Sequence, residues 1–210
     1  MIELLRLLAW LSPAFPTGGF AYSHGLEFAI ECGDVRDGET LRAWIEDVLL
    51  HGSGRNDAIL LRHAHRGADV AMLNELAAAS ATSRERHSET LDQGTAFAVA
   101  AKAWGVPALP TPVSYPIAIG AVAGRHDIDA EAIVSGYLQA FAANLISAAV
   151  RVVPLGQTVG LAVLAALEPT VLRVAELTRE QTIDDIGGCA FRSDIAAMRH
   201  ETQQTRLFRT

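Results

Sequence analysis

A nineteen-residue stretch without a charge limits what this chain can fold into more than any other feature. It reads AIVSGYLQAFAANLISAAV, from position 132 to position 150. A helix of this length is long enough to cross a membrane, but Gln139 and Asn144 would then lie near the bilayer centre, which is unfavourable. A second uncharged stretch, 103–124, contains four prolines, which argue against a spanning helix. We therefore expect residues 132–150 to form the buried central helix of a bundle, with no membrane contact.

Apolar residues recur with helical spacing along nearly the whole chain, and we see no useful period-two segment and no internal repeat. Asp37, Asp69 and Asp129 stand where N-caps are expected, and Pro169 suits the first position of a helix. A further helix is expected to begin near Gly19. The other expected helices cover residues 2–11, 38–51, 56–66, 70–80, 84–104, 130–153, 157–167 and 169–180. The sequence thus predicts an all-α fold, a single-domain helical bundle over residues 1–210.

Composition points to a protein that binds other proteins. Half of the residues are hydrophobic, only 20% are charged, and the mean hydropathy is +0.22. A chain with so much apolar surface usually covers part of it with a partner. The net charge of −7 argues against nucleic acid as the main partner.

The C-terminal end has the opposite charge. Residues 192–210 contain four arginines and two acidic residues, a local balance of +2. Such a basic tail can dock on an acidic partner or on its own acidic body. We expect a flexible tail that becomes ordered when a partner binds.

The two cysteines, Cys32 and Cys189, form no CxxC motif and do not make a disulfide framework. A reduced cytoplasmic protein is the simplest interpretation. The N-terminus shows no signal-peptide pattern.

Residue spacing argues against a catalytic site and against a preformed metal site. Ser23 and His24 are adjacent, so on a helix their side chains would point about 100° apart. A hydrolase that uses Ser23 as its nucleophile is therefore the least favoured of the functions that we consider. His63 and His65 are two positions apart and would diverge on a helix. The His200-Glu201 pair lacks the second histidine of a zincin, and there is no phosphate-binding loop. We predict no catalytic residue, no metal ligand and no cofactor.

The segment RVVPLGQTVG, residues 151–160, interrupts the most apolar part of the chain. One interpretation is a turn between two helices. The other is a polar passage through the core, lined by Pro154, Gly156 and Gln157, since a broken buried helix exposes backbone groups that need partners.

Three segments together resemble the UreF family of urease accessory proteins. They are SPAFPTGGFAYSHGLE near the start, RVVPLGQ in the last third and DIAAMRHETQQTRLFR at the end, and their order and spacing also fit. SRERHSETLDQG, residues 83–94, is similar to the central arginine-containing helix of the family.

The resemblance implies an all-helical protein that is not an enzyme. It implies an adaptor that binds UreD and recruits or modulates the GTPase UreG, so that nickel, as cargo, reaches apo-urease. It also implies a homodimer within the complex. The alternative is a nickel-storing metallochaperone that uses His24, His63, His65 or Cys189.

The resemblance also suggests which residues contact partners. The proline- and glycine-rich segment would be a binding surface that presents Tyr22 and its neighbours, and Arg206 and Phe208 would anchor the tail. The expected partner-binding residues are Pro16, Phe20, Tyr22, Ser23, His24, Glu27, Arg199, His200, Glu201, Arg206, Leu207 and Phe208.

Overall fold

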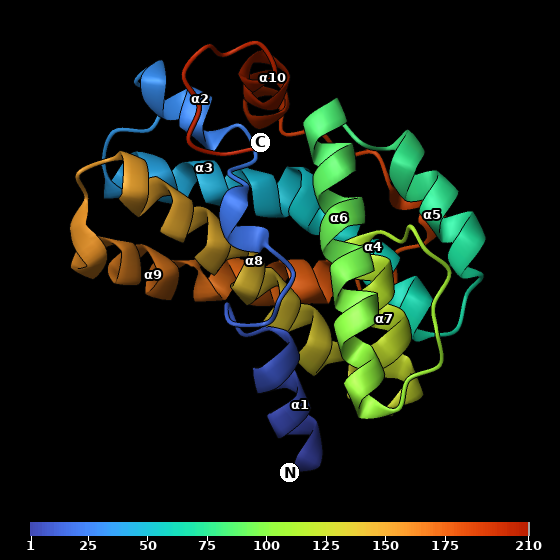
Figure 1. The fold of residues 1–210 in the computed structure, drawn as a ribbon. Coiled ribbons are helices and arrows are strands. Elements are labelled where there is room, and N and C mark those ends of the chain that lie inside the picture. The colour runs from blue at the N-terminus through green and yellow to red at the C-terminus, as the bar shows by residue number, and fades with distance from the viewer. Residues whose placement is uncertain (210) are drawn as a thin grey trace.

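The computed structural model describes residues 1–209, and this part of the chain contains helices and loops but no strand (Figure 1). The all-α prediction is confirmed. The α-helices are α1 (Ile2–Trp10), α2 (Leu26–Glu31), α3 (Gly38–His51), α4 (Ser53–His65), α5 (Val70–Ala79), α6 (Arg84–Ala100), α7 (Tyr115–Arg125), α8 (Ala130–Val152), α9 (Gly156–Leu177) and α10 (Phe191–His200). Three short 3₁₀ turns are η1 (Gly19–Ala21), η2 (Ala101–Trp104) and η3 (Ile183–Asp185).

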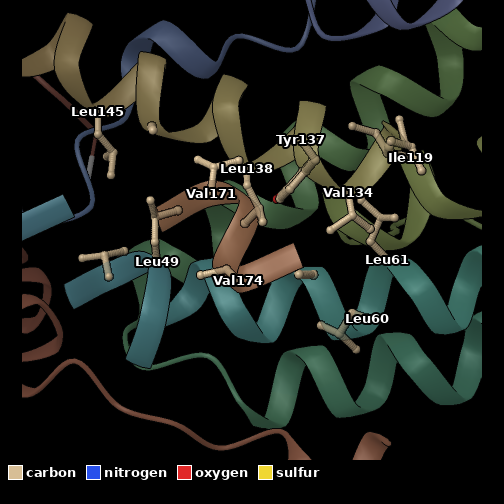
Figure 2. Packing of buried hydrophobic residues seen from close by; sticks show 14 of the residues in the cluster. Leu49, Leu60, Leu61, Ile119, Val134, Tyr137, Leu138, Leu145, Val171 and Val174 are labelled. Atoms are coloured by element: carbon tan, nitrogen blue, oxygen red, sulfur yellow. The ribbon is translucent and has the colours of Figure 1, made fainter. Parts of the chain in front are cut away.

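Helix α8 is the central element of the bundle, as the uncharged stretch predicted. It packs against α9, α4, α2 and α3, and its inward side chains include Val134, Leu138 and Leu145 (Figure 2). Side chains of α3, α4, α7 and α9 close the same core. Burying this apolar area is the main term that stabilises the bundle.

Helices α4 and α7 form the closest pair, and two glycines make this possible. A Cβ atom on Gly120 would lie 2.2 Å from the carbonyl oxygen of Leu61, and one on Gly124 would lie 2.2 Å from that of His65. No other residue type allows the two backbones to approach so closely.

The predicted N-caps are confirmed. Asp37 accepts a hydrogen bond from the Thr40 N–H at 2.8 Å in a capping box, and Asp69 and Asp129 cap α5 and α8. Each such cap stabilises its helix by about 1 kcal/mol.

Two helix predictions were wrong. Pro169 does not begin a helix but lies inside α9, which runs from Gly156 to Leu177. Pro169 and Ala165, whose carbonyl loses its partner, are both exposed, so water can satisfy that carbonyl. The helix expected near Gly19 is only the turn η1, because Gly18, His24 and Gly25 have positive φ angles that an α-helix does not allow.

The C-terminal tail is ordered in the single chain. Residues 191–200 form α10, and the following residues return along the N-terminal segment (Figure 1). The prediction of a flexible tail that orders only on a partner is therefore not confirmed. The structure instead shows the other option, in which the tail docks on its own body.

Helices α8 and α9 are each long and apolar enough to cross a membrane, but this is weak support for a span. Half of the most apolar window of α8 is buried inside the bundle, and 39% of that of α9. Both are core helices. Helix α9 exposes Leu161, Leu172 and Leu177 on its outer side.

Helix α1 projects from the bundle (Figure 1). Its base is fixed by Trp10, which is fully buried and makes edge contacts with Phe97 and Trp104. Toward the N-terminus four large apolar side chains are more than half exposed, which is unusual for a helix without a partner. They are Ile2, Leu4, Leu5 and Leu8.

Candidate partner-binding site

The two terminal motifs, which are far apart in the sequence, lie side by side in the structure. Helix α2, at the end of the proline- and glycine-rich segment, packs against α10 (Figure 1). After α10 the chain continues along the same segment, and the Arg209 N–H donates to the Ala21 carbonyl at 2.8 Å. We call residues 201–209 the C-terminal segment.

Glu27 connects the two motifs. Its carboxylate is 5% exposed and accepts hydrogen bonds from the N–H groups of Leu207, at 2.7 Å, and Phe208, at 3.0 Å. The Nε2 atom of His200 lies 3.2 Å from the same carboxylate. Buried backbone N–H groups need acceptors, so Glu27 determines where the C-terminal segment lies.

Helix α6 contributes a second carboxylate. Glu85 Oε2 lies 2.7 Å from His200 Nδ1, and Glu85 Oε1 accepts a hydrogen bond from Arg206 at 2.7 Å. Ser83 to Gly94 was expected to be the central arginine-containing helix, and this contact shows that it helps to hold the tail.

The RVVPLGQ motif reaches the same place through Arg151, a residue that the sequence analysis did not select as a site residue. The Arg151 guanidinium donates to the Phe20 carbonyl at 2.8 Å and lies 4.4 Å from the centre of the Phe208 ring. This combination of a hydrogen bond and a cation–π contact ties the end of α8 to both termini.

Pro154, Gly156 and Gln157 are all exposed, at the turn between α8 and α9. The interpretation of RVVPLGQTVG as a helix–helix turn is confirmed, and a polar passage lined by these residues is not found. The helix breaks at its surface end, where water satisfies the freed backbone groups.

A buried polar network lies behind the N-terminal segment. His24 Nε2 is 2.7 Å from Glu89 Oε1, and Arg86 forms an ion pair with Glu89 while its Nη1 atom lies 2.8 Å from His24 Nε2. Burial alone would raise the pKa of Glu89, but the charge of Arg86 and the contact with His24 outweigh it and lower the pKa to about 2. Glu89 is therefore ionised at neutral pH.

The network continues across the core. Asp57 of α4 accepts a hydrogen bond from the Tyr137 hydroxyl of α8 at 2.7 Å, and burial raises the pKa of Asp57 to about 6. Arg86, Glu89 and Gln93 are spaced three and four positions apart on α6. That spacing of polar residues on one helical face was the available sequence signal for the network.

The predicted site residues divide into two groups. Six of them are buried, so the prediction that Tyr22 is presented on the surface was wrong, as it was for Ser23 and His24. These six are Tyr22, Ser23, His24, Glu27, His200 and Phe208.

The other group faces solvent. Pro16, Phe20, Arg199, Arg206 and Leu207 are exposed, and Glu201 is half-buried beside Arg84. Whether they contact a partner stays a prediction. Phe20 and Leu207 are 69% and 73% exposed, which is high for large apolar side chains.

Helix α10 adds an apolar stripe to this exposed group. Phe191, Ile195 and Met198 follow the i, i+4, i+7 spacing of one helical face and are 72%, 54% and 51% exposed. Arg192 and Arg199 are exposed on the same helix. Apolar side chains beside arginines are typical of protein–protein interfaces. We call Phe191, Ile195 and Met198 the α10 stripe.

The residues considered for nickel storage lie in separate surroundings. His63 Nε2 faces the Gln181 carbonyl and His65 Nε2 the Ile128 carbonyl, at 3.2 and 2.7 Å, while His24 belongs to the buried network and Cys189 is exposed. Within residues 1–209 no three histidine, cysteine or acidic side chains are grouped so that they would hold a metal ion.

Comparison with known proteins decides the family. The family model described as UreF matches residues 35–168, which is more than half of the chain. The chain belongs to the UreF family. The resemblance seen in the motifs is therefore confirmed.

Curated relatives extend the match beyond that range. A urease accessory protein UreF from Methylorubrum populi is 50% identical, with 100% of both chains covered. One from Cereibacter sphaeroides is 54% identical over 99% of this chain and 98% of its own length, and one from Mesorhizobium japonicum 49% over 100% and 97%. The match thus includes both termini that form the site. Membership of this family implies a role in urease maturation, and the relatives are named as accessory proteins.

Proposed function

We propose that this chain is a non-catalytic adaptor in urease maturation. It binds UreD, and the pair recruits or modulates the GTPase UreG, so that nickel is delivered to apo-urease in the cytoplasm. Nickel is cargo of the assembly in this proposal, and the chain carries no cofactor of its own.

The surface around α10 carries this proposal. The α10 stripe, Phe20 and Leu207 are exposed apolar side chains, and Arg192, Arg199 and Arg206 are exposed as well. Glu27 contacts His200 at the end of α10 and the backbone of Leu207, and Arg151 contacts the backbone of Phe20. A rigid base under an apolar, arginine-rich surface is what a tight protein interface needs, because little ordering entropy remains to be lost on binding.

Exposed apolar residues elsewhere support the expected homodimer. Helix α1 and the outer side of α9 leave large apolar side chains in contact with water, and association would bury them. Helix α1 projects from the end of the bundle opposite α10 (Figure 1), so a dimer formed through α1 would leave the α10 stripe accessible to UreD.

The enzyme and storage alternatives have weaker support. Ser23 is 0% exposed, so a substrate would not reach its hydroxyl. The histidines considered for nickel storage are engaged in separate contacts. Tight stoichiometric nickel binding by the isolated chain would support storage in place of the adaptor.

Co-purification tests the proposal. The chain is expressed with UreD, with and without UreG, and the complexes are measured by size-exclusion chromatography with light scattering. We expect a stable complex with UreD that takes up UreG only when this chain is present. Failure to bind UreD, with the chain correctly folded, would contradict the proposal.

A further inference from the structure

The ring of His200 lies between two carboxylates, in the interior of the protein. The side chain is 0% exposed. Its Nδ1 atom is 2.7 Å from Glu85 Oε2 and its Nε2 atom is 3.2 Å from Glu27 Oε2. Both ring nitrogens thus face carboxylate oxygens, one on α6 and one on α2.

Counting protons indicates the charge of this ring. An ionised carboxylate only accepts hydrogen bonds, and a neutral imidazole has a single N–H. A neutral ring would therefore turn one lone pair toward a carboxylate oxygen. The other contacts of both carboxylates are donors as well: Leu207 and Phe208 donate to Glu27, and Arg206 donates to Glu85.

We propose that His200 is an imidazolium in the native protein, and that this buried charge fastens the C-terminal segment to α2 and α6. Two cations, His200 and Arg206, then balance the two carboxylates. With a neutral His200 ring, the buried Glu27 carboxylate would face uncharged groups, the ring and the N–H groups of Leu207 and Phe208, which is strongly unfavourable.

Other charged groups of the surrounding elements are already engaged. On α2, Glu31 accepts from Gln203 at 2.6 Å, and on α6, Arg84 pairs with Glu201 at 2.9 Å. Arg86 is turned toward His24 and Glu89. Glu27 and Glu85 are thus the carboxylates in contact with the ring.

The buried ionic contact holds the segment that carries Arg206 and Leu207 against α2 and α6, whichever partner the protein binds.

The protonation state can be measured directly on the isolated wild-type chain. Long-range correlations between the ring nitrogens and the carbon-bound ring protons, measured by NMR, distinguish an imidazolium from either neutral tautomer. We expect the signals of an imidazolium at neutral pH. A neutral ring at pH 7 would overturn the proposal, and this readout needs no variant.

Hydrogen exchange tests the consequence. After correction for the intrinsic rate, the protection of the Leu207 and Phe208 amides should fall at least about tenfold in Glu27→Gln and in His200→Gln. Amides of α8 should stay protected in both variants.

Matched controls remove charge elsewhere. Glu39→Gln and His51→Gln change exposed residues of α3 and should leave protection at Leu207 and Phe208 unchanged. Unchanged protection in His200→Gln would contradict the role of the charge.

Discussion

Gly25 lies so close to Ala197 that a Cβ atom on Gly25 would be 2.3 Å from the Ala197 backbone nitrogen. Gly25 also has a φ angle of +72°, in the region that side chains other than glycine rarely adopt. A single glycine of the N-terminal motif therefore sets how closely α2 and α10 approach. The docking of the C-terminal segment depends on this approach.

Replacing Gly25 tests the dependence. Gly25→Ala should displace α10, because the clash is with backbone and no flexible side chain can move away, and the positive φ adds about 1–2 kcal/mol of strain. We expect loss of amide protection in α10 and weaker UreD binding. The control is Gly33→Ala, since Gly33 has a φ of +79° with nothing within 4 Å. If Gly25→Ala and Gly33→Ala reduced amide protection and UreD binding equally, backbone strain at a positive φ angle would explain both, and the close approach to Ala197 would not matter.

Arg206 is expected to matter for recruitment more than for stability. Its pair with Glu85 is partly exposed, so Arg206→Ala should lower the free energy of unfolding by less than about 1 kcal/mol. UreG uptake by the complex with UreD should fall, as measured by co-purification. Arg42→Ala removes a similar pair on α3 and should leave uptake intact. Normal uptake with Arg206→Ala would exclude this side chain as an anchor.

A charge placed in the α10 stripe should weaken binding without unfolding the chain. Ile195 is 54% exposed, so Ile195→Asp should leave the helical circular dichroism unchanged. The dissociation constant for UreD, measured by titration calorimetry, should rise about tenfold or more, because an interface core does not tolerate an unpaired charge. Leu172→Asp on α9 provides a comparison at an exposed apolar residue of a different helix. If only Leu172→Asp weakens binding, the interface lies on α9 instead.

Arg62 is predicted to be the most important ionic residue for stability. It is 2% exposed, forms two hydrogen bonds with Glu131 at 2.8 and 2.9 Å, and donates to the Ala175 carbonyl at 2.6 Å. It thereby joins α4, α8 and α9. Arg62→Met should lower the free energy of unfolding by about 3 kcal/mol in urea denaturation. Arg179→Met removes an exposed partner of the same Glu131. It should lower the free energy of unfolding much less than Arg62→Met does. Similar losses would contradict this account.

Asp57 should make the protein less stable as the pH rises from about 4 to about 6. Burial raises its pKa to about 6 in the folded state, so between these values the folded chain binds more protons than the unfolded chain. Stability then falls with rising pH across this window, by about 3 kcal/mol, and stays constant above it.

The comparison with Asp57→Asn isolates the effect. Asparagine can still accept the Tyr137 hydrogen bond but does not ionise. The difference in unfolding free energy between wild type and variant, measured by urea denaturation from pH 4 to pH 8, should fall through the window. Glu89, whose folded pKa is depressed, loses its contribution only below about pH 4.5, and this loss cancels in the difference. A flat difference would contradict the buried, ionisable role of Asp57.

Local sequence signals predicted most of the helices because their causes are local. Asp37, Asp69 and Asp129 cap helices through neighbours three residues away or fewer, and the apolar spacing of α3 and α8 follows from the helical period. Pro169 misled the prediction because whether a helix continues through proline depends on whether water reaches the freed carbonyl. Whether water reaches that carbonyl depends on which side of α9 faces solvent in the folded protein.

The sequence by itself determined the all-α class, the central position of α8 and, through its motifs, the family. Only the tertiary structure decided that Tyr22, His24, Glu27 and His200 are buried and that Arg151, Glu85 and Glu89 belong with them. Hydrogen bonds such as those from Leu207 and Phe208 to Glu27 join residues about 180 positions apart. No local pattern encodes such a pairing, because it exists only once α2, α6 and α10 have packed together.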